Sequence, residues 1–349
     1  MKLTVHLVTW NGAKYVPHLF DSLRSQTFTD WELVVFDNGS TDGMLEKIKE
    51  SLHDFPTQTV IFENSSNIGF ANGHNYVYRE TESEYFVLLN QDLWLEQDCF
   101  KKMVQFMDAH QEVAVVSPRL MKWNFIHLED DKAGMDYVYS DQVDSLGLKV
   151  LRNRRVVEQY GQKSWEQIEH SFSSQFLEVF GVSGTLPLFR RSAVKAVAYE
   201  NGDFFDSLYH SYKEDVDLPF RLRSQGYKAY VLLDAVAYHD RSAAGPVALS
   251  DSAALKNKKK QSELIRYHSY KNHLMTLYKN EYIQNFLLDF PFILWYEVKK
   301  FFYNLFFDRG VIKGLKVVWE NKKEIKEKKT YISQKRKKDW KEMRKYMSL

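Results

Sequence analysis

Short apolar runs alternate with stretches of helical periodicity over the first 255 residues of the chain. The runs most typical of strands occupy residues 3–8, 32–36, 59–63 and 85–89. Between them, apolar residues recur at the spacing of an amphipathic helix, first at Val16, Leu19, Phe20 and Leu23 and then at Met44, Ile48 and Leu52. This alternation predicts βαβ units around a mostly parallel sheet, which is an α/β fold.

Polar residues directly follow three of these runs. They are residues 9–11 (Thr-Trp-Asn), 37–40 (Asp-Asn-Gly-Ser) and 90–92 (Asn-Gln-Asp). Ligands of such sheets bind at the carboxyl ends of the strands. We therefore expect a binding site where these three segments meet.

Asp37 has two interpretations. It can cap the helix that follows, as carboxylates in Asp-Asn-Gly-Ser turns often do. It can instead accept a hydrogen bond from the imide nitrogen of a pyrimidine base. Further on, residues 67–75 contain Gly69, and a glycine in such a loop lets the backbone approach a ligand closely. The segment lacks the signature of a phosphate-binding loop.

Asp92 and His239 are candidate metal ligands, because each ends an apolar run with a polar side chain. A hard cation needs few protein ligands when substrate phosphates supply the others. Mn²⁺ accepts imidazole more readily than Mg²⁺ does, and either ion suits this pair. A structural role for His239 is the alternative.

The densest acidic cluster lies in residues 212–218, Tyr-Lys-Glu-Asp-Val-Asp-Leu. Carboxylates in the first turn of a helix stabilise it, so a solvated helix start is one interpretation. The other follows from the apolar residues around the acids. A partly buried carboxylate beside another acid can have a raised pKa and act as a general base near neutral pH. Glu214 and Asp215 are the candidates.

The composition fits a globular chain of 349 residues with 44% hydrophobic content. The single cysteine, Cys99, excludes a disulfide framework and a Cys-rich zinc site. The first apolar run follows Met1-Lys2 immediately and is too short for a signal peptide. We therefore expect a cytoplasmic protein. A spanning helix is not expected, because no uncharged apolar run reaches about 18 residues.

Charge divides the chain into an acidic body and a basic tail. Residues 256–349 hold 24 Lys and Arg against 10 Asp and Glu, which leaves 24 against 36 for the rest. Residues 283–307 add many large aromatic side chains. Aromatics beside lysines suit an anionic membrane surface better than nucleic acid. We expect a peripheral segment on the inner face of the cell membrane, and a chain ending near residue 254 to stay soluble. A tail packed on the body or on a second subunit is the alternative.

Seven motifs together resemble glycosyltransferase family 2, in its rhamnosyltransferase-type branch. They occur in the family's order over residues 1 to about 245, and they are Thr9-Trp10-Asn11, Asp37-Asn38-Gly39-Ser40-Thr41-Asp42, Asn67-Ile68-Gly69-Phe70, Asn90-Gln91-Asp92, Gly184 with Arg190-Arg191, Glu214-Asp215-Val216-Asp217-Leu218 and His239. The segment from Tyr267 to Asn272 resembles the Arg-Asn segment that opens the branch's C-terminal helices. One departure is that Asn90 replaces the first carboxylate of the family's Asp-x-Asp motif.

The resemblance implies a GT-A (Rossmann-like) domain over residues 1–250 and a C-terminal helical region over residues 251–349. It implies an inverting, metal-dependent transferase with Asp215 as base and Glu214 beside it, Asp92 on a Mg²⁺ or Mn²⁺ ion and His239 supporting that ion or the diphosphate. The nucleotide sugar would be bound by Thr9, Asn11, Asp37, Gly69, Asn90 and Gly184. The favoured donor is dTDP-L-rhamnose, with a UDP-hexose as the alternative. The acceptor would be a glycan or a polyprenyl-linked saccharide of cell-surface glycan synthesis.

Two other classes of protein compete with this interpretation. A nucleotidyltransferase should carry an early glycine-rich loop with a basic residue, and residues 9–12 offer only Thr-Trp-Asn-Gly. A non-catalytic sugar-binding or scaffold protein should lack the acids at the base and metal positions, and both acids are present. The sequence leaves the oligomeric state open.

Overall fold

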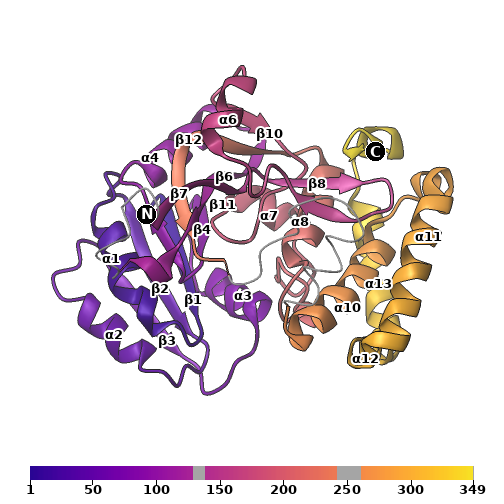
Figure 1. The fold of residues 1–349 in the computed structure, drawn as a ribbon, viewed down its shortest axis with the longest axis horizontal. Coiled ribbons are helices and arrows are strands. Elements are labelled where there is room, and N and C mark those ends of the chain that lie inside the picture. The colour runs from indigo at the N-terminus through magenta and orange to yellow at the C-terminus, as the bar shows by residue number, and fades with distance from the viewer. Residues whose placement is uncertain (129–137, 242–260, 349) are drawn as a thin grey trace.

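The computed structural model describes residues 1–128, 138–241 and 261–348. Its centre is a ten-stranded mixed sheet in the order β10-β12-β6-β11-β4-β1-β2-β3, with β5 added beside β12 and β7 beside β6 (Figure 1). The strands of this sheet are β1 (Leu3–Thr9), β2 (Trp31–Asp37), β3 (Thr59–Glu63), β4 (Tyr85–Leu89), β5 (Leu93–Leu95), β6 (Val113–Trp123), β7 (Tyr139–Ser145), β10 (Phe176–Glu178), β11 (Leu188–Arg190) and β12 (Lys228–His239).

The four strands expected from the sequence form the parallel half of this sheet. β3, β2, β1 and β4 are neighbours and all run in the same direction. The carboxyl ends of these strands therefore lie along one edge. Residues 9–11 and 37–40 begin with the last residue of β1 and of β2, and residues 90–92 follow β4. Antiparallel β11 separates this half from β6 and β12. The expected α/β fold is confirmed. The sheet is mixed and not mostly parallel as expected, because β5, β7, β10 and β11 pair antiparallel with their neighbours.

Helices cover both faces of the sheet. Successive side chains of a strand point to opposite faces, and in the central strands both sets are apolar and need cover. Tyr85, Val87 and Leu89 pack with one group of helices, and Phe86 and Leu88 pack on the other side. The helices of the body are α1 (Val16–Arg24), α2 (Met44–Ser51), α3 (Phe70–Glu80), α4 (Cys99–Ala109), α6 (Trp165–Ile168), α7 (Arg191–Val197) and α8 (Glu214–Gln225).

The C-terminal helices form a layer on one side of the body (Figure 1). They are α10 (Glu263–Asn280), α11 (Ile283–Phe307), α12 (Arg309–Glu320), α13 (Lys322–Lys335) and α14 (Trp340–Arg344). After them, β13 (Met347–Ser348) joins β8 (Leu148–Leu151) and β9 (Val156–Glu158) in a second, three-stranded sheet. The end of the chain therefore pairs with the body.

Two expectations from the sequence concern this layer: the domain boundary before it and the lack of a membrane-spanning helix. The predicted boundary between residues 250 and 251 lies outside the described residues, so the division stays a prediction. Across the described helices, none is both long and apolar enough to cross a membrane.

Candidate functional site

A cavity of about 760 Å³ opens beside the carboxyl end of β4. Its walls come from the ends of β4 and β12, the β8–β9 hairpin, the start of α8 and the first half of α10. Of the site residues expected from the sequence, six line it: Asn90, Asp92, Gly184, Glu214, Asp215 and His239. The fold thus brings residues together that lie as far apart in the chain as 90 and 239.

Asp92 and His239 are neighbours because β5 pairs with the end of β12, where Leu93 lies opposite His239. The His239 Nε2 atom is 3.4 Å from the Asp92 carboxylate, and its Nδ1 atom is 2.9 Å from the carboxylate of Asp144. Burial opposes the charged imidazole, but Asp92 and Asp144 outweigh it and raise the pKa of His239 to about 9. With Nδ1 held by Asp144, Nε2 faces Asp92 across the site.

Three charged residues around this pair, Asp144, Glu158 and Arg241, were not among the site residues expected from the sequence. Arg241 contacts the Asp144 carboxylate at 3.5 Å and the Glu158 carboxylate at 3.0 Å, and it donates a hydrogen bond to Ser183. Burial opposes the ionisation of Asp144, but Arg241 and His239 outweigh burial and hold the pKa of Asp144 below its usual range. The position of Arg241, two residues after His239, was a usable signal. Glu158 lies in an ordinary strand with no such signal.

Glu214 and Asp215 open α8 and face the same cavity. Asp215 is half-buried and lies 3.4 Å from the backbone N–H of Gly184. Glu214 is buried, and its Oε2 atom has no hydrogen-bond partner among the described residues. Burial, reinforced by the charge of Asp215, raises the pKa of Glu214 well above its usual value. The raised pKa expected for this acidic pair therefore belongs to Glu214.

The third acid of the cluster, Asp217, has a structural role. It is fully buried on the inner side of α8 and is bound by Arg221 at 3.0 Å and by Lys279 of α10 at 3.0 Å. Burial opposes its ionisation, but Lys279 and Arg221 outweigh burial and lower its pKa. Asp217 does not line the cavity.

The other expected nucleotide-binding residues lie along the sheet edge, outside the lining of the cavity. The Asp37 carboxylate accepts hydrogen bonds from the Thr9 hydroxyl and the Ser40 backbone N–H, each at 3.0 Å. Asn11 has a positive φ of 49° and accepts a hydrogen bond from the Thr41 backbone N–H. Asp37 thus holds the turn at residues 37–40, but it does not cap α2, whose first N–H, that of Met44, is bound by Asp42. Each carboxylate oxygen of Asp37 can also accept a further hydrogen bond.

Gly69 is required by its backbone, since its φ is 90° and a Cβ atom there would lie 2.5 Å from the His210 carbonyl oxygen. The next residue, Phe70, lines the cavity. Gly69 therefore joins the loop before α3 to the loop before α8.

Arg190 and Arg191 have structural roles. Arg190 donates to the carbonyls of Val113, Met107 and His110, and Arg191 donates to those of Ser83 and Tyr78. Both guanidinium groups thus hold β11 and the start of α7 against α3, α4 and β6.

The model of the family described as Glycosyl transferase family 2 matches residues 4–197, more than half of the chain. The chain belongs to this family. Staphylococcus aureus poly(ribitol-phosphate) beta-N-acetylglucosaminyltransferase TarS is 29% identical over 112 residues, 32% of this chain and 19% of that protein. Escherichia coli chondroitin synthase is 30% identical over 96 residues, 28% of this chain and 14% of that protein. The chain therefore spans a fifth or less of the length of these relatives.

Membership of glycosyltransferase family 2 confirms the family resemblance and the GT-A fold, and the helices α10 to α14 confirm the helical C-terminal region. Among solved structures, GalNAc-T7 with UDP, GalNAc and Mn²⁺ aligns with a TM-score of 0.57, at 11% identity over 80% of this chain and 48% of that one. At that identity the similarity concerns the fold alone.

Asp92 and His239 are the possible ligands of a divalent metal ion in this cavity. Across the described parts of the chain, no three His, Cys, Asp or Glu side chains are grouped to hold an ion. Asp92 and His239 offer two ligands on the cavity wall, and phosphate and water oxygens complete such a shell in many enzymes. The hydrogen bond that the far nitrogen of His239, Nδ1, donates to the Asp144 carboxylate is the outer support that metal-binding histidines have. The residues therefore fit a metal that is shared with a phosphorylated substrate.

Proposed function

We propose that the protein is an inverting glycosyltransferase that moves a sugar from a nucleotide diphosphate to an acceptor hydroxyl. The observation that carries this proposal is one cavity in which Asp215 and Glu214 lie with the Asp92–His239 pair, in a chain of glycosyltransferase family 2. A base for the acceptor and a site for the diphosphate are the two elements that such a transfer needs. A non-catalytic sugar-binding protein would need neither.

The chemistry proposed for this site is a single displacement at the anomeric carbon. The acceptor oxygen forms a bond to that carbon while the bond to the diphosphate oxygen breaks, and the hydroxyl proton passes to the Asp215 carboxylate. Attack from the opposite side inverts the configuration. Asp215 suits this role because it lines the cavity. Among the described residues, no arginine or lysine forms an ion pair with its carboxylate, which contacts the backbone N–H of Gly184.

Asp92 and His239 would hold the Mg²⁺ or Mn²⁺ ion in this proposal. When bound, the ion neutralises charge on the departing diphosphate. Asp144 keeps the imidazole of His239 oriented, and Arg241 keeps Asp144 ionised. These roles follow from the contacts within the chain.

The donor that we propose is dTDP-L-rhamnose, on the resemblance to the rhamnosyltransferase-type branch. A UDP-hexose is the alternative, and the name of the S. aureus relative, an N-acetylglucosaminyltransferase, supports it. The proposed acceptor is a lipid-linked saccharide or a polysaccharide in cell-surface glycan synthesis. We propose a cytoplasmic location, peripheral on the inner face of the membrane.

The test is turnover of purified protein with a panel of dTDP- and UDP-sugars, with Mg²⁺, with Mn²⁺ and with a chelator. We expect slow hydrolysis of one donor that stops with chelator.

Asp215→Asn should bind that donor normally and lose about 10² to 10⁴ in transfer rate, because an amide cannot accept the proton. Asp92→Ala should lose metal-dependent donor binding, whereas Asp37→Ala should weaken the nucleotide with or without metal. No turnover of any donor, or full transfer by Asp215→Asn, would contradict the proposal.

A further inference from the structure

The helix α11 turns its apolar side chains outward. Its buried residues are Asn285, Asp289, Ile293 and Asn304, three of which are polar. Its exposed large apolar residues are Ile283, Leu287, Leu288, Phe290, Phe292, Leu294, Trp295, Val298, Phe301, Phe302, Phe306 and Phe307. A surface helix of a soluble protein has the opposite arrangement. At 25 residues the helix is about 37 Å long, so this outer face is a large continuous apolar surface.

Ion pairs fix which face of α11 points outward. The fully buried Asp289 carboxylate is bound by Arg152 at 2.7 Å, by Arg154 at 2.9 Å and by Arg344 at 3.1 Å. The Asn285 amide donates a hydrogen bond to the Trp340 carbonyl at 2.8 Å. Turning the helix to hide its apolar face would strand these polar groups without partners, which is costly. The exposed apolar face is therefore a property of the folded chain.

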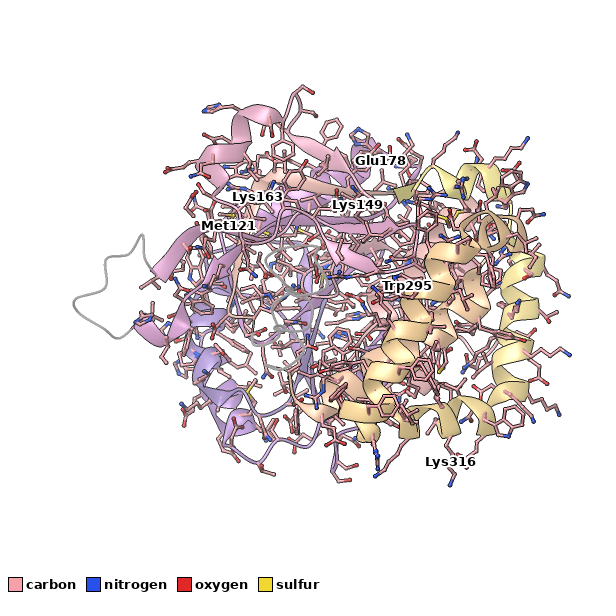
Figure 2. All side chains as sticks on the ribbon, turned by 45° about the vertical axis from the view of Figure 1, so that its right-hand side comes forward. Met121, Lys149, Lys163, Glu178, Trp295 and Lys316 are labelled. Atoms are coloured by element: carbon pink, nitrogen blue, oxygen red, sulfur yellow. The ribbon has the colours of Figure 1, made fainter. Side chains whose placement is uncertain are left out.

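Charge on and beside this face indicates what covers it. Among the exposed residues of α11, all of which the structure describes, Gln284 is the only polar one. The next helix, α12, packs against α11, and α12 and α13 add exposed lysines, which include Lys313, Lys316, Lys322, Lys323 and Lys326. Figure 2 shows Trp295 on α11 and Lys316 on α12 within this helical layer. Apolar insertion beside lysines is the chemistry that binds an anionic bilayer surface.

We propose that the outer face of α11 docks on an anionic membrane surface, with α11 lying in the plane of the interface. The β8–β9 hairpin links α11 to the cavity: Lys149 and Arg155 line the cavity, whereas Arg152 and Arg154 hold Asp289 on the buried side of the helix. Docking through the outer face of α11 would therefore hold the hairpin that lines the cavity near the membrane, with α11 between the two. That this position serves a lipid-borne acceptor rests on the proposed function, whereas the docking itself does not.

Flotation with vesicles tests the docking without any donor or acceptor. At low salt we expect the full chain to float with vesicles that contain phosphatidylglycerol, to float less at high salt, and to float weakly with phosphatidylcholine alone. The variant Leu287→Glu/Trp295→Glu/Phe302→Glu should lose at least tenfold in bound fraction at an unchanged melting temperature, because all three side chains are exposed. Ile126→Glu is the matched control, since Ile126 is exposed on the body.

Two results would overturn the docking proposal. One is a full chain that stays unbound with phosphatidylglycerol vesicles at low salt. The other is a wild-type dimer in light scattering that the triple variant converts to monomer, with no flotation of either, since α11 would then join two copies of the chain. Donor turnover by a chain that fails to float would keep the proposed function and reject the docking alone.

A second, independent observation concerns Asn272 of α10. Its side chain is fully buried, and its amide donates hydrogen bonds to the carbonyls of Tyr209 at 2.9 Å, Ser211 at 2.9 Å and Tyr212 at 2.6 Å. The loop that it holds contains three non-glycine residues with positive φ: His210, Tyr212 and Lys213. Such residues persist only where the surroundings fix them.

The loop held by Asn272 joins both sides of the cavity. It leads directly into Glu214 and Asp215, and its His210 carbonyl accepts a hydrogen bond from the Ala71 backbone N–H at 2.9 Å. The geometry points to Asn272 as a positioning residue for the Asp215 carboxylate. It acts through the backbone of residues 209–213 and does not line the cavity.

The test compares Asn272→Ala with Asn285→Ala, which removes an equally buried asparagine amide that neither lines the cavity nor contacts the loop at residues 209–213. We expect amide hydrogen exchange of residues 209–216 to rise at least tenfold in the first variant only. In the transfer assay of the proposed function, kcat should fall at least tenfold with donor KM within about threefold. Asn272→Ser, which keeps one donor, should be intermediate in both and covers the case in which the alanine variant fails to fold. Unchanged exchange in Asn272→Ser and Asn272→Ala, or equal loss in Asn285→Ala, would overturn the assignment.

Discussion

At the scale of single residues, three acids within four positions of one helix have three different environments. Asp217 is neutralised by Lys279 and Arg221 inside the protein. Glu214 is buried and has a raised pKa, while Asp215 faces the cavity from a half-buried position. All three acids lie in the first turn of α8. Asp217 has one local partner in Arg221, a helical turn further on, but its second partner Lys279 lies far away in the chain.

The raised pKa of Glu214 predicts a pH-dependent cost in stability. The folded chain holds a proton on Glu214 that the unfolded chain releases above pH 4.5, so wild-type stability falls as pH rises from about 4.5 toward the folded pKa. The groups that face it are Asp215, which raises the pKa further, Lys213, which lowers it, and Tyr212. Glu214→Gln imitates the protonated form and removes this dependence.

We therefore expect urea denaturation of Glu214→Gln and wild type to diverge as pH rises from 4 to 8, with the variant gaining relative stability. Below pH 4.5 the difference between them should be constant. Asp215→Asn provides the comparison for activity: Glu214→Gln should keep far more transfer at neutral pH. Parallel stability curves across the whole range would contradict a proton on Glu214.

At the scale of elements, the site depends on strand pairings that no local pattern shows. Antiparallel β5 pairs with the end of β12 and thereby brings Asp92 beside His239. The β7 strand pairs with β6 and supplies Asp144 to the same histidine. The α10 helix supplies Ile265 and Ser269 to the cavity wall. A helix from the C-terminal region is thus part of the site.

At the scale of the whole molecule, buried ion pairs join the C-terminal helices to the body. Lys279 of α10 is fully buried and contacts Asp206 and Asp217, and it also donates a hydrogen bond to the Tyr199 hydroxyl at 2.9 Å. Lys328 of α13 adds a second contact to Asp206 at 2.6 Å. The sequence suggested a separable tail and a soluble chain ending near residue 254, a position outside the described residues. This packing predicts that such a shortened chain unfolds or aggregates.

Lys279→Met tests this joint. Loss of the cation leaves two buried carboxylates with fewer partners, so we expect the free energy of unfolding to fall by about 3 kcal/mol. Urea denaturation at neutral pH measures the loss, and Lys316→Met, at an exposed lysine of α12, should change stability by less than about 0.5 kcal/mol. Because the pKa of Asp217 is lowered, wild type should keep this stabilisation at neutral pH and lose it on acidification. A Lys279→Met variant as stable as wild type would show that the helical layer contributes little to the body.

The sequence by itself determined the parallel half of the sheet, because hydrophobic periodicity is a local property of strands and helices. It also located Asp92 and His239, because polar residues that end apolar runs mark the edge where ligands bind, and it located Glu214 and Asp215 as members of the densest acidic cluster. Only the tertiary structure decided which of the acids are free to act, because pairing with Lys279 or Arg241 depends on distant strands and helices, whereas Arg221 lies on the same helix as Asp217. It likewise decided that α11 buries Asn285 and Asp289 and exposes its aromatic residues, since the direction in which a helix faces is set by the ion pairs that it makes with the rest of the chain.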